Sequence, residues 1–272
     1  MKKIPIGVID VDFGGMNVLY SLKQEFPYED FIYLNDIKNL PYEGKEHQII
    51  LKYIKKNVEY LLSLGIKALI IVSDTIIEYG SEYLESLDIP VISLVQSIID
   101  YVNLNYENKN MILCTKDYIL KANLYQKNIK YGHLSSASSN KLDNIIENNK
   151  IKTMKAFNAS SDIFKQFQNR DFDVFIYTTP WIELVRVEIL EFLKVKDFIK
   201  VSDIIASNLG KLEIEFYKKG QGKLLALSTI EKEEFVKMAP WFKLKYKYLN
   251  VKDLIEAENE QNRTIQKDNQ GI

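Results

Sequence analysis

The stretch IKALIIVSDTIIEYG, from Ile66 to Gly80, joins a strand pattern, a polar turn and a helix pattern. Its continuous apolar run is typical of a central parallel strand that helices cover on both faces. The polar turn holds Ser73, Asp74 and Thr75. Because open α/β sheets bind ligands at the carboxyl ends of their strands, the sequence predicts a site at this turn.

The same order of strand, turn and helix recurs on both sides of this stretch. In the first part of the chain we expect strands over 4–10, 31–35 and 90–94, and helices over 16–26 and 46–64. Asp10 closes the first strand, and a Gly14-Gly15 pair follows it. Strands that alternate with helices in this way predict an α/β fold with mainly parallel central sheets.

A second run of the same kind begins near residue 110. We expect a strand over 110–114, a helix over 121–129, a loop over 133–144 leading to a short helix near Ile145, strands over 173–177, 198–201 and 223–228, and a helix over 202–218 capped by Ser202. The strand over 173–177 ends in a second polar turn, Thr178-Thr179-Pro180-Trp181. The polar, aperiodic tail after residue 256 is predicted to be disordered.

Composition excludes several classes of function. A formal net charge of -1, from 36 basic and 37 acidic residues, gives no excess of positive charge with which to bind the phosphate backbone of a nucleic acid. No run approaches the roughly 18 to 20 apolar residues that span a bilayer, and the N-terminus lacks a secretory pattern, so we expect no membrane partner and a cytoplasmic location. The single Cys114 excludes an internal disulfide and a cysteine-rich zinc site. Without a histidine cluster or a phosphate loop, we expect no metal or cofactor.

Four stretches carry a family resemblance: GVIDVDFGG at 7–15, EDFIYLNDIKNLPYEGK at 29–45, KALIIVSDTI at 67–76 and LALSTIEKEEFVKMAPWF at 225–242. Through them the chain resembles the glutamate racemase family, within the aspartate/glutamate racemase superfamily, over nearly its whole length. The resemblance implies two pseudo-symmetric α/β domains, an active site in the cleft between them, and a homodimer. We expect the first domain at 1–95 plus 205–256, the second at 96–204, and the tail at 257–272.

The thiols on which the family's mechanism depends are missing from both site motifs. In the family, one cysteine on each side of the α-carbon removes or returns its proton. Here Ser73 stands where the family has the cysteine of ACNT, and Thr178 or Thr179 stands where it has that of GCTH. Cys114 matches neither position and is predicted to be a buried apolar residue. Because a hydroxyl has a pKa far above that of a thiol, two-base racemisation is not expected.

The resemblance also shows a change in the charge of the pocket. Val11 replaces the family's serine, Asp74 replaces its asparagine, and Glu43 replaces its glycine. These changes remove donors for a substrate carboxylate and add acceptors. A small molecule bound in the cleft is therefore predicted to be an amine or a cation rather than a dicarboxylate.

The candidate residues fall into two groups. The candidate catalytic residues are Asp10, Ser73, Thr178 and Thr179, and the candidate ligand-binding residues are Val11, Asp12, Pro41, Tyr42, Glu43, Asp74, Thr75, Pro180 and Trp181. Asp10, Pro41, Tyr42 and Thr75 match the family, and Glu147 aligns with one of its glutamates. His47 and His133 are expected to be solvated.

Each candidate has a structural alternative. Ser73 is either an activated hydroxyl or a steric replacement for a cysteine, and Asp10 is either an acid/base group or the cap of the following turn. Asp12, Asp74 and Glu43 either line a site for a cation or an amine or are solvated acids. Trp181 or Pro180 takes the place of the family's imidazole, and Trp181 either stacks on a ligand or fills that space.

Two functional hypotheses follow. In the first, the chain is a racemase homologue that has lost two-thiol racemisation and acts by binding a small molecule or a partner. In the second, it is an enzyme of altered chemistry, such as a lyase, a hydrolase or a cyclising enzyme, that uses serine, threonine and aspartate in the cleft. An open cleft with Ser73 facing a threonine favours the enzyme, and a cleft filled by Phe13, Trp181 or Tyr177 favours the binding protein.

Overall fold

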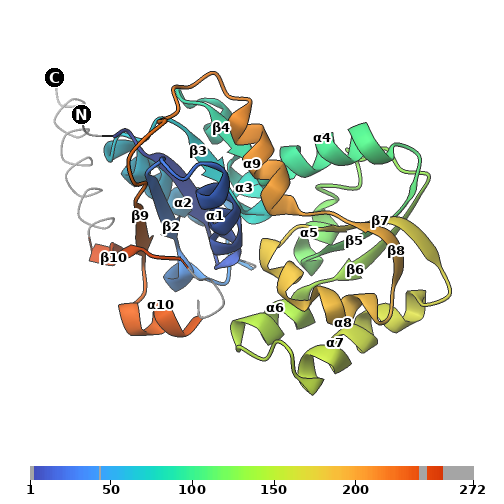
Figure 1. Cartoon of the computed structure of the whole chain (residues 1–272). Coiled ribbons are helices and arrows are strands. Elements are labelled where there is room, and N and C mark those ends of the chain that lie inside the picture. The colour runs from blue at the N-terminus through green and yellow to red at the C-terminus, as the bar shows by residue number, and fades with distance from the viewer. Residues whose placement is uncertain (1–2, 43, 239–243, 254–272) are drawn as a thin grey trace.

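Two parallel β-sheets organise the chain, and helices cover both (Figure 1). The computed structural model describes residues 3–42, 44–238 and 244–253. Strand order is β10-β9-β2-β1-β3-β4 in the six-stranded sheet and β6-β5-β7-β8 in the four-stranded sheet. Every strand pairing is parallel. The predicted α/β fold with mainly parallel sheets is confirmed.

The first sheet draws its strands from both ends of the chain. Its elements are β1 (Ile6–Asp10), α1 (Gly14–Glu25), β2 (Phe31–Asn35), η1 (Ile37–Asn39), α2 (His47–Ser63), β3 (Leu69–Ile71), α3 (Asp74–Glu85), β4 (Val91–Ser93), β9 (Leu224–Ser228), α10 (Lys232–Met238) and β10 (Lys247–Asn250). Two further helices, α4 (Leu94–Tyr106) and α9 (Val201–Gly210), pack against each other and, through α9, against α1.

The second sheet is built from one continuous segment. Its elements are β5 (Asn110–Thr115), α5 (Asp117–Ala122), β6 (His133–Ser138), α6 (Asn140–Glu147), α7 (Met154–Phe164), η2 (Lys165–Phe167), β7 (Asp171–Tyr177), η3 (Pro180–Val185), α8 (Arg186–Leu190) and β8 (Lys194–Phe198). Among the described residues of the whole chain, no helix is long and apolar enough to cross a membrane.

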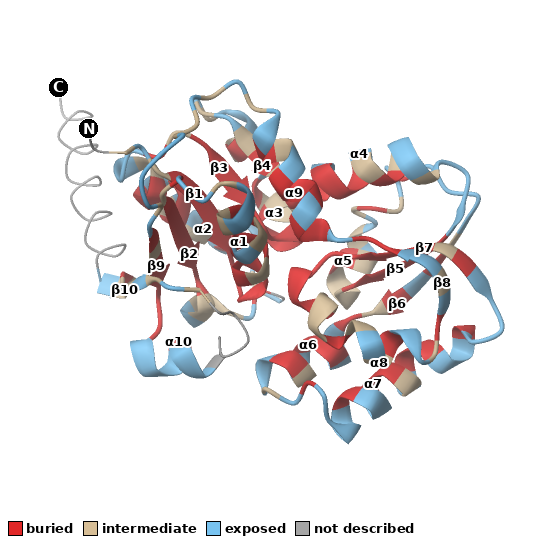
Figure 2. Cartoon of the chain, viewed as in Figure 1, coloured by how far each residue is buried: buried red, intermediate tan, exposed pale blue. Residues whose placement is uncertain are grey.

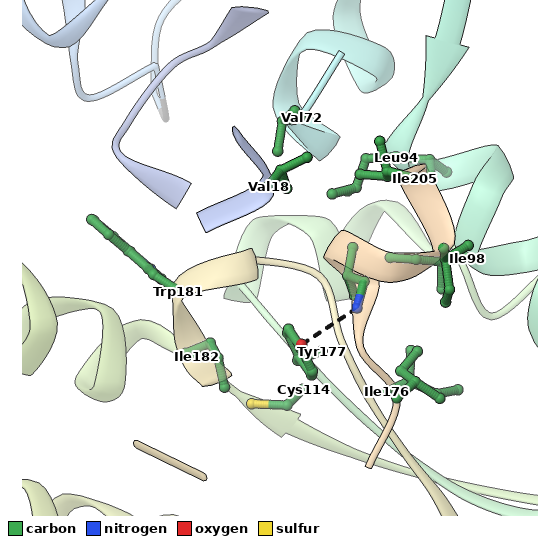
Figure 3. Packing of buried hydrophobic residues seen from close by; sticks show 14 of the residues in the cluster. Val18, Val72, Leu94, Ile98, Cys114, Ile176, Tyr177, Trp181, Ile182 and Ile205 are labelled. Atoms are coloured by element: carbon green, nitrogen blue, oxygen red, sulfur yellow. Dashed lines mark hydrogen bonds between the residues drawn. The ribbon is translucent and has the colours of Figure 1, made fainter. Parts of the chain in front are cut away.

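The central strands are buried throughout, as their apolar runs predict. All residues of β1, β2 and β3 are buried, and Figure 2 shows these inner strands in the colour of buried residues, whereas the edge strands β8 and β10 are largely exposed or intermediate. Cys114 on β5 is fully buried and lies near Tyr177 in the packed interior (Figure 3), so its predicted role as a buried apolar residue is confirmed.

The Gly14-Gly15 pair allows a close approach between backbone and side chains. A Cβ atom on Gly15 would lie 2.7 Å from the Tyr33 ring and 3.2 Å from a carboxylate oxygen of Asp10. The first turn of α1 therefore sits directly on the strand-end residue Asp10, which only a glycine permits at this position.

Four predicted elements of the second half were wrong. The helix expected over 121–129 is α5, which ends at Ala122 because Asn123 takes a left-handed conformation with φ 56°. The expected loop over 133–144 is strand β6 and the start of α6. A serine-rich segment forms a strand here because β6 is an edge strand whose side chains are partly solvated.

The remaining two errors concern the region around residue 200. The strand expected over 198–201 is β8, which ends at Phe198. The helix expected over 202–218 is α9, which ends at Gly210; Lys200 is its N-cap residue, and Ser202 is buried inside the helix. The predicted disordered tail lies outside the described residues, and so does Glu43.

Candidate functional site

The carboxyl ends of the two sheets meet, and hydrogen bonds join them. Asp74, after β3, accepts hydrogen bonds on Oδ2 from the Thr178 hydroxyl at 2.8 Å and from the Thr115 hydroxyl at 3.3 Å. The two threonine hydroxyls are 2.6 Å apart. We call Asp74, Thr115 and Thr178 the strand-end network, because each lies at or just beyond the end of a strand.

Asp74 is an acceptor that the protein itself satisfies. Only 4% of the residue is exposed. Burial raises the pKa of Asp74, while the charge of Lys116 and the hydrogen bond from Thr178 oppose the rise. Thr75 donates to Oδ1 at 3.5 Å, and its hydroxyl also contacts that of Tyr118. The carboxylate therefore holds parts of both sheets together.

Ser73 is the N-cap of α3. Its Oγ accepts a hydrogen bond from the backbone N–H of Ile76 at 3.3 Å, and the residue is only 5% exposed. A serine at this position satisfies one of the free N–H groups in the first turn of a helix. This role accounts for the side chain without catalytic chemistry.

Asp10 has a similar structural role at the start of α1. Its Oδ1 accepts hydrogen bonds from the backbone N–H groups of Val11 at 2.7 Å and Asp12 at 3.3 Å, and its Oδ2 accepts one from Gly15 at 2.6 Å. Burial, followed by the nearby charge of Asp12, raises the pKa of Asp10 well above its ordinary value. Asp10 thus closes the turn after β1.

A cavity of about 430 Å³ lies beside the strand-end network, between the two sheets. We call it the cleft cavity. Its walls come from the turn after β1, the segment around η1, the starts of α3, α5 and η3, and one side of α6 along its whole length. The lining residues are Val11, Asp12, Phe13, Ile37, Leu40, Pro41, Tyr42, Thr75, Lys116, Tyr118, Asn140, Asp143, Asn144, Glu147 and Trp181.

An ion pair spans the cleft cavity. Lys116, directly after β5, places its Nζ 3.0 Å from Oδ2 of Asp12, after β1. Both side chains are mostly buried. Burial alone would lower the pKa of Lys116, but the charge of Asp12, with Tyr118 and Asp143, raises it well above its ordinary value. The lysine is therefore a permanent cation whose partner comes from the other sheet.

Asp143 and Trp181 form another part of the cavity wall. Asp143 on α6 accepts hydrogen bonds from the Ser139 hydroxyl at 2.6 Å and from the Trp181 indole N–H at 2.8 Å. Burial raises the pKa of Asp143 to about 6, against the effects of Lys116 and of these two hydrogen bonds. The pair places an ionisable carboxyl group, held in one orientation, at the surface of the cavity.

The predicted site residues are divided by the structure. Those that line the cleft cavity are Val11, Asp12, Pro41, Tyr42, Thr75 and Trp181; those that do not are Asp10, Ser73, Asp74, Thr178, Thr179 and Pro180. The carbonyl of Pro180 instead accepts a hydrogen bond from the Asn17 side chain of α1 at 3.0 Å. His47 and His133 are exposed, as expected.

Sequence reasoning missed five lining residues that carry charge or hydrogen-bonding groups, namely Lys116, Tyr118, Asn140, Asp143 and Asn144. Lys116 follows a strand directly, and that position was an available signal. Asp143 lies in the segment that was predicted to be a loop, so no pattern placed it on a helix facing the cleft. Within the described residues, no group of three or more His, Cys, Asp or Glu side chains is arranged to hold a metal ion.

Comparison with known proteins shows which proteins this chain is similar to. No family model matches the chain. The glutamate racemase of Clostridium acetobutylicum is 26% identical over 248 residues, covering 88% of this chain and 97% of that protein. The glutamate racemase of Persephonella marina is 32% identical over 126 residues, about half of either protein. The structure of the Thermus thermophilus glutamate racemase, in complex with β-chloro-D-alanine, aligns with TM-score 0.82 at 20% identity over 92% of this chain and 97% of that one.

Two parallel sheets that meet at their carboxyl ends over a cavity give this chain the fold of the solved glutamate racemases and of the aspartate racemase of Picrophilus torridus. The chain is similar to glutamate racemases over nearly its whole length in sequence and in fold, which confirms the resemblance of the four sequence motifs.

Proposed function

We propose that this glutamate racemase homologue binds a small molecule in the cleft cavity and does not carry out two-thiol racemisation. The observation that carries the proposal is the 2.8 Å hydrogen bond between Thr178 and Asp74. By the family resemblance, Thr178 and Ser73 stand at or beside the positions of the two catalytic cysteines. In the family's mechanism the substrate lies between the two cysteine positions. Here a direct hydrogen bond joins the turn after β3 to the turn after β7, so it takes up the space that a substrate would need between them.

The groups at these positions are poor bases. The Thr178 hydroxyl is engaged by Asp74 and Thr115, and Ser73 caps a helix. Cys114, the single cysteine of the chain, is fully buried, and burial, followed by the charge of Asp143, raises its pKa well above the ordinary value. A thiol of that kind does not supply the thiolate that a proton abstraction needs.

The charges of the cleft cavity favour a cation over a dicarboxylate. Asp12, Asp143 and Glu147 face the cavity, against the single cation Lys116, which is already paired with Asp12. A carboxylate brought within about 4 Å of another would be repelled by about 4 kcal/mol at the effective dielectric of a partly exposed site. A ligand amine would meet attraction instead, and the aromatic rings of Tyr118 and Trp181 in the walls also suit a cation.

The same contacts argue against an enzyme of altered chemistry. That alternative needs Ser73 and a threonine facing each other across open space, and neither Ser73, Thr178 nor Thr179 lines the cleft cavity. Phe13 and Trp181 line the cavity without filling it, so room for a ligand remains. Binding is the function that this arrangement supports best.

Hydrogen exchange at the α-carbon tests the loss of racemisation. D- and L-glutamate are incubated separately with the protein in D₂O, and loss of the α-proton signal is followed by NMR, with an active glutamate racemase as the positive control. We expect no exchange above the protein-free rate. Appreciable exchange of either enantiomer would overturn the proposal.

A thermal-shift panel of amines, amino acids and dicarboxylates tests the binding function, and we expect stabilisation by amines alone. From the family resemblance we also propose a homodimer in the cytoplasm. Sedimentation equilibrium of the full chain tests the dimer, and a single species of monomer mass would contradict it.

A further inference from the structure

Asp143 combines burial with unused acceptor capacity at a cavity wall. The residue is only 5% exposed, yet it lines the cleft cavity. Each of its oxygens accepts one hydrogen bond, Oδ1 from Trp181 and Oδ2 from Ser139. An ionised carboxylate offers about four acceptor sites. About two acceptor sites therefore remain for a ligand, on a group whose orientation the protein has fixed.

The charged neighbours of Asp143 do not neutralise it directly. Lys116 faces it from the end of β5, Asp12 from the turn after β1, and Glu147 from the next turn of its own helix; Cys114 lies close by on β5. Lys116 forms its ion pair with Asp12 at 3.0 Å. Within the described residues, Asp143 forms no ion pair of its own.

We propose that Asp143 is the recognition group of the cleft cavity and selects ligands that carry a protonated primary amine, with Trp181 as the residue that positions it. The proposal rests on the proposed binding function and names its ligand class. A primary ammonium supplies N–H donors for the remaining acceptor sites, and charge-assisted hydrogen bonds of this kind are the strong ones. A carboxylate ligand would meet a buried like charge at the same place.

This assignment differs from an acidic surface patch in what holds the carboxylate. Trp181 contributes its only donor to Asp143 and is itself 1% exposed, so its indole cannot turn away without breaking packing. Ser139 at the start of α6 is fully buried as well. A carboxylate fixed by two buried donors is prepared for a ligand before the ligand arrives, which lowers the entropy cost of binding.

The recognition group also fixes how binding depends on pH. The amine is bound by the ionised form of Asp143, whose pKa is about 6, while an alkylamine stays protonated across this range. Affinity should therefore be full above about pH 7 and fall as the pH drops through about 6. Trp181→Phe removes a hydrogen bond that favours the ionised form, so the pKa of Asp143 should rise and the midpoint of the affinity loss should move to higher pH.

The first experiment uses n-butylamine as the probe, with butyrate as a charge-inverted control of the same length and tetramethylammonium as a cation without N–H donors. NMR titration of the full chain near pH 8 gives the three affinities. We expect n-butylamine to bind more tightly than both controls. If wild type binds butyrate or tetramethylammonium as tightly as n-butylamine, or does not bind n-butylamine, this inference is overturned. The loss of racemisation would then still stand, because glutamate exchange decides it separately.

Two matched variants locate the group. Asp143→Asn keeps the size and removes the charge, and we expect about a tenfold or greater loss of n-butylamine affinity, as for a hydrogen bond to a charged group. Glu147→Gln makes the same change at an exposed position of the same helix, and we expect a smaller loss. An equal or larger effect of Glu147→Gln would show that Asp143 is not the recognition group.

The role of Trp181 must be tested with a quantity that a simple loss of packing would not change, and the pH midpoint of the affinity loss is such a quantity. Affinities of wild type and Trp181→Phe for n-butylamine are measured from about pH 5 to about pH 8. We expect near-equal affinity at the upper end and a midpoint shifted upward in the variant. A loss that is uniform across the pH series, or no change at all, would remove Trp181 from the proposal.

Discussion

The strand-end network and the cleft cavity lie side by side but differ in how their polar groups are used. In the network, the Asp74 carboxylate accepts hydrogen bonds from Thr115 and Thr178, so these donors and this acceptor are paired with one another inside the protein. In the cavity wall, Asp143 keeps acceptor capacity and faces open space. A polar group beside the cleft therefore indicates a binding site only where the protein leaves some of its hydrogen-bonding capacity free for a ligand.

This difference separates position from function. The residues at the family's thiol positions are those most fully satisfied by the protein, whereas the neighbouring positions Lys116, Asp143 and Trp181 form the walls of the space that remains. Under the proposed binding function, the groups that recognise the ligand therefore lie on α6 and in η3 rather than at the positions of the family's thiols.

The largest expected effect comes from breaking the ion pair across the cavity. Lys116→Met leaves the carboxylate of Asp12 in a mostly buried position without its cation, which should lower the free energy of unfolding by about 3–5 kcal/mol. Urea denaturation measures it. The double variant Lys116→Met/Asp12→Asn should recover most of the loss, and failure to recover would show that the pair itself is not the cause.

A second effect appears only when the pH is varied. The pKa of Asp143 is about 6 in the folded chain and 3.8 in its unperturbed state, so the folded state binds more protons between these values. Stability from this group is present below about pH 4 and is lost as the pH rises to about 6, by roughly 3 kcal/mol in all. Asp143→Asn should remove this slope from urea denaturation curves measured across the window. An unchanged slope would refute the shifted pKa.

The network itself is tested at one of its threonines. Thr178→Val removes a donor to buried Asp74 while keeping the side-chain shape, and the expected loss is about 1–3 kcal/mol in the free energy of unfolding. Thr179→Val is the matched control, since the same atoms change one residue away at a side chain outside the network. Equal losses in the two variants would contradict the special role of Thr178.

The smallest effect is expected at Ser73. Ser73→Ala should cost about 1 kcal/mol, the usual value of an N-cap, and should leave ligand binding unchanged because Ser73 does not line the cavity. Ser93→Ala removes the equivalent cap of α4, where Oγ accepts from Gln96 at 3.2 Å, and should cost a similar amount. A clear loss of ligand affinity in Ser73→Ala alone would return Ser73 to the list of functional residues.

The fold and the site positions could be predicted to different extents from the sequence. Central strands such as β1 and β3 carry continuous apolar runs because both faces are covered, and that pattern is readable. Strand β6 alternates buried and solvated positions with serines, so it was taken for a loop. The end of α5 depends on the conformation of a single residue, Asn123, which periodicity does not detect.

The site was predictable only as a location. Turns after β1, β3 and β7 could be named in advance because parallel strands end at one edge of a sheet. Whether Asp74 faces a ligand or a threonine depends on residues more than 40 positions away, namely Thr115 and Thr178. Asp143 could not be found at all, because its role comes from a tertiary hydrogen bond with Trp181.

The order of strands in the first sheet has a consequence for synthesis on the ribosome. Strand β2 pairs with β1 on one side and with β9 on the other, and β9 begins only at residue 224. The second sheet, by contrast, is complete once residue 198 has emerged. A nascent chain therefore carries a finished second sheet while one edge of β2 is still unpaired, and such an edge can recruit other chains. Chaperone protection of this protein should matter most during the last part of its translation.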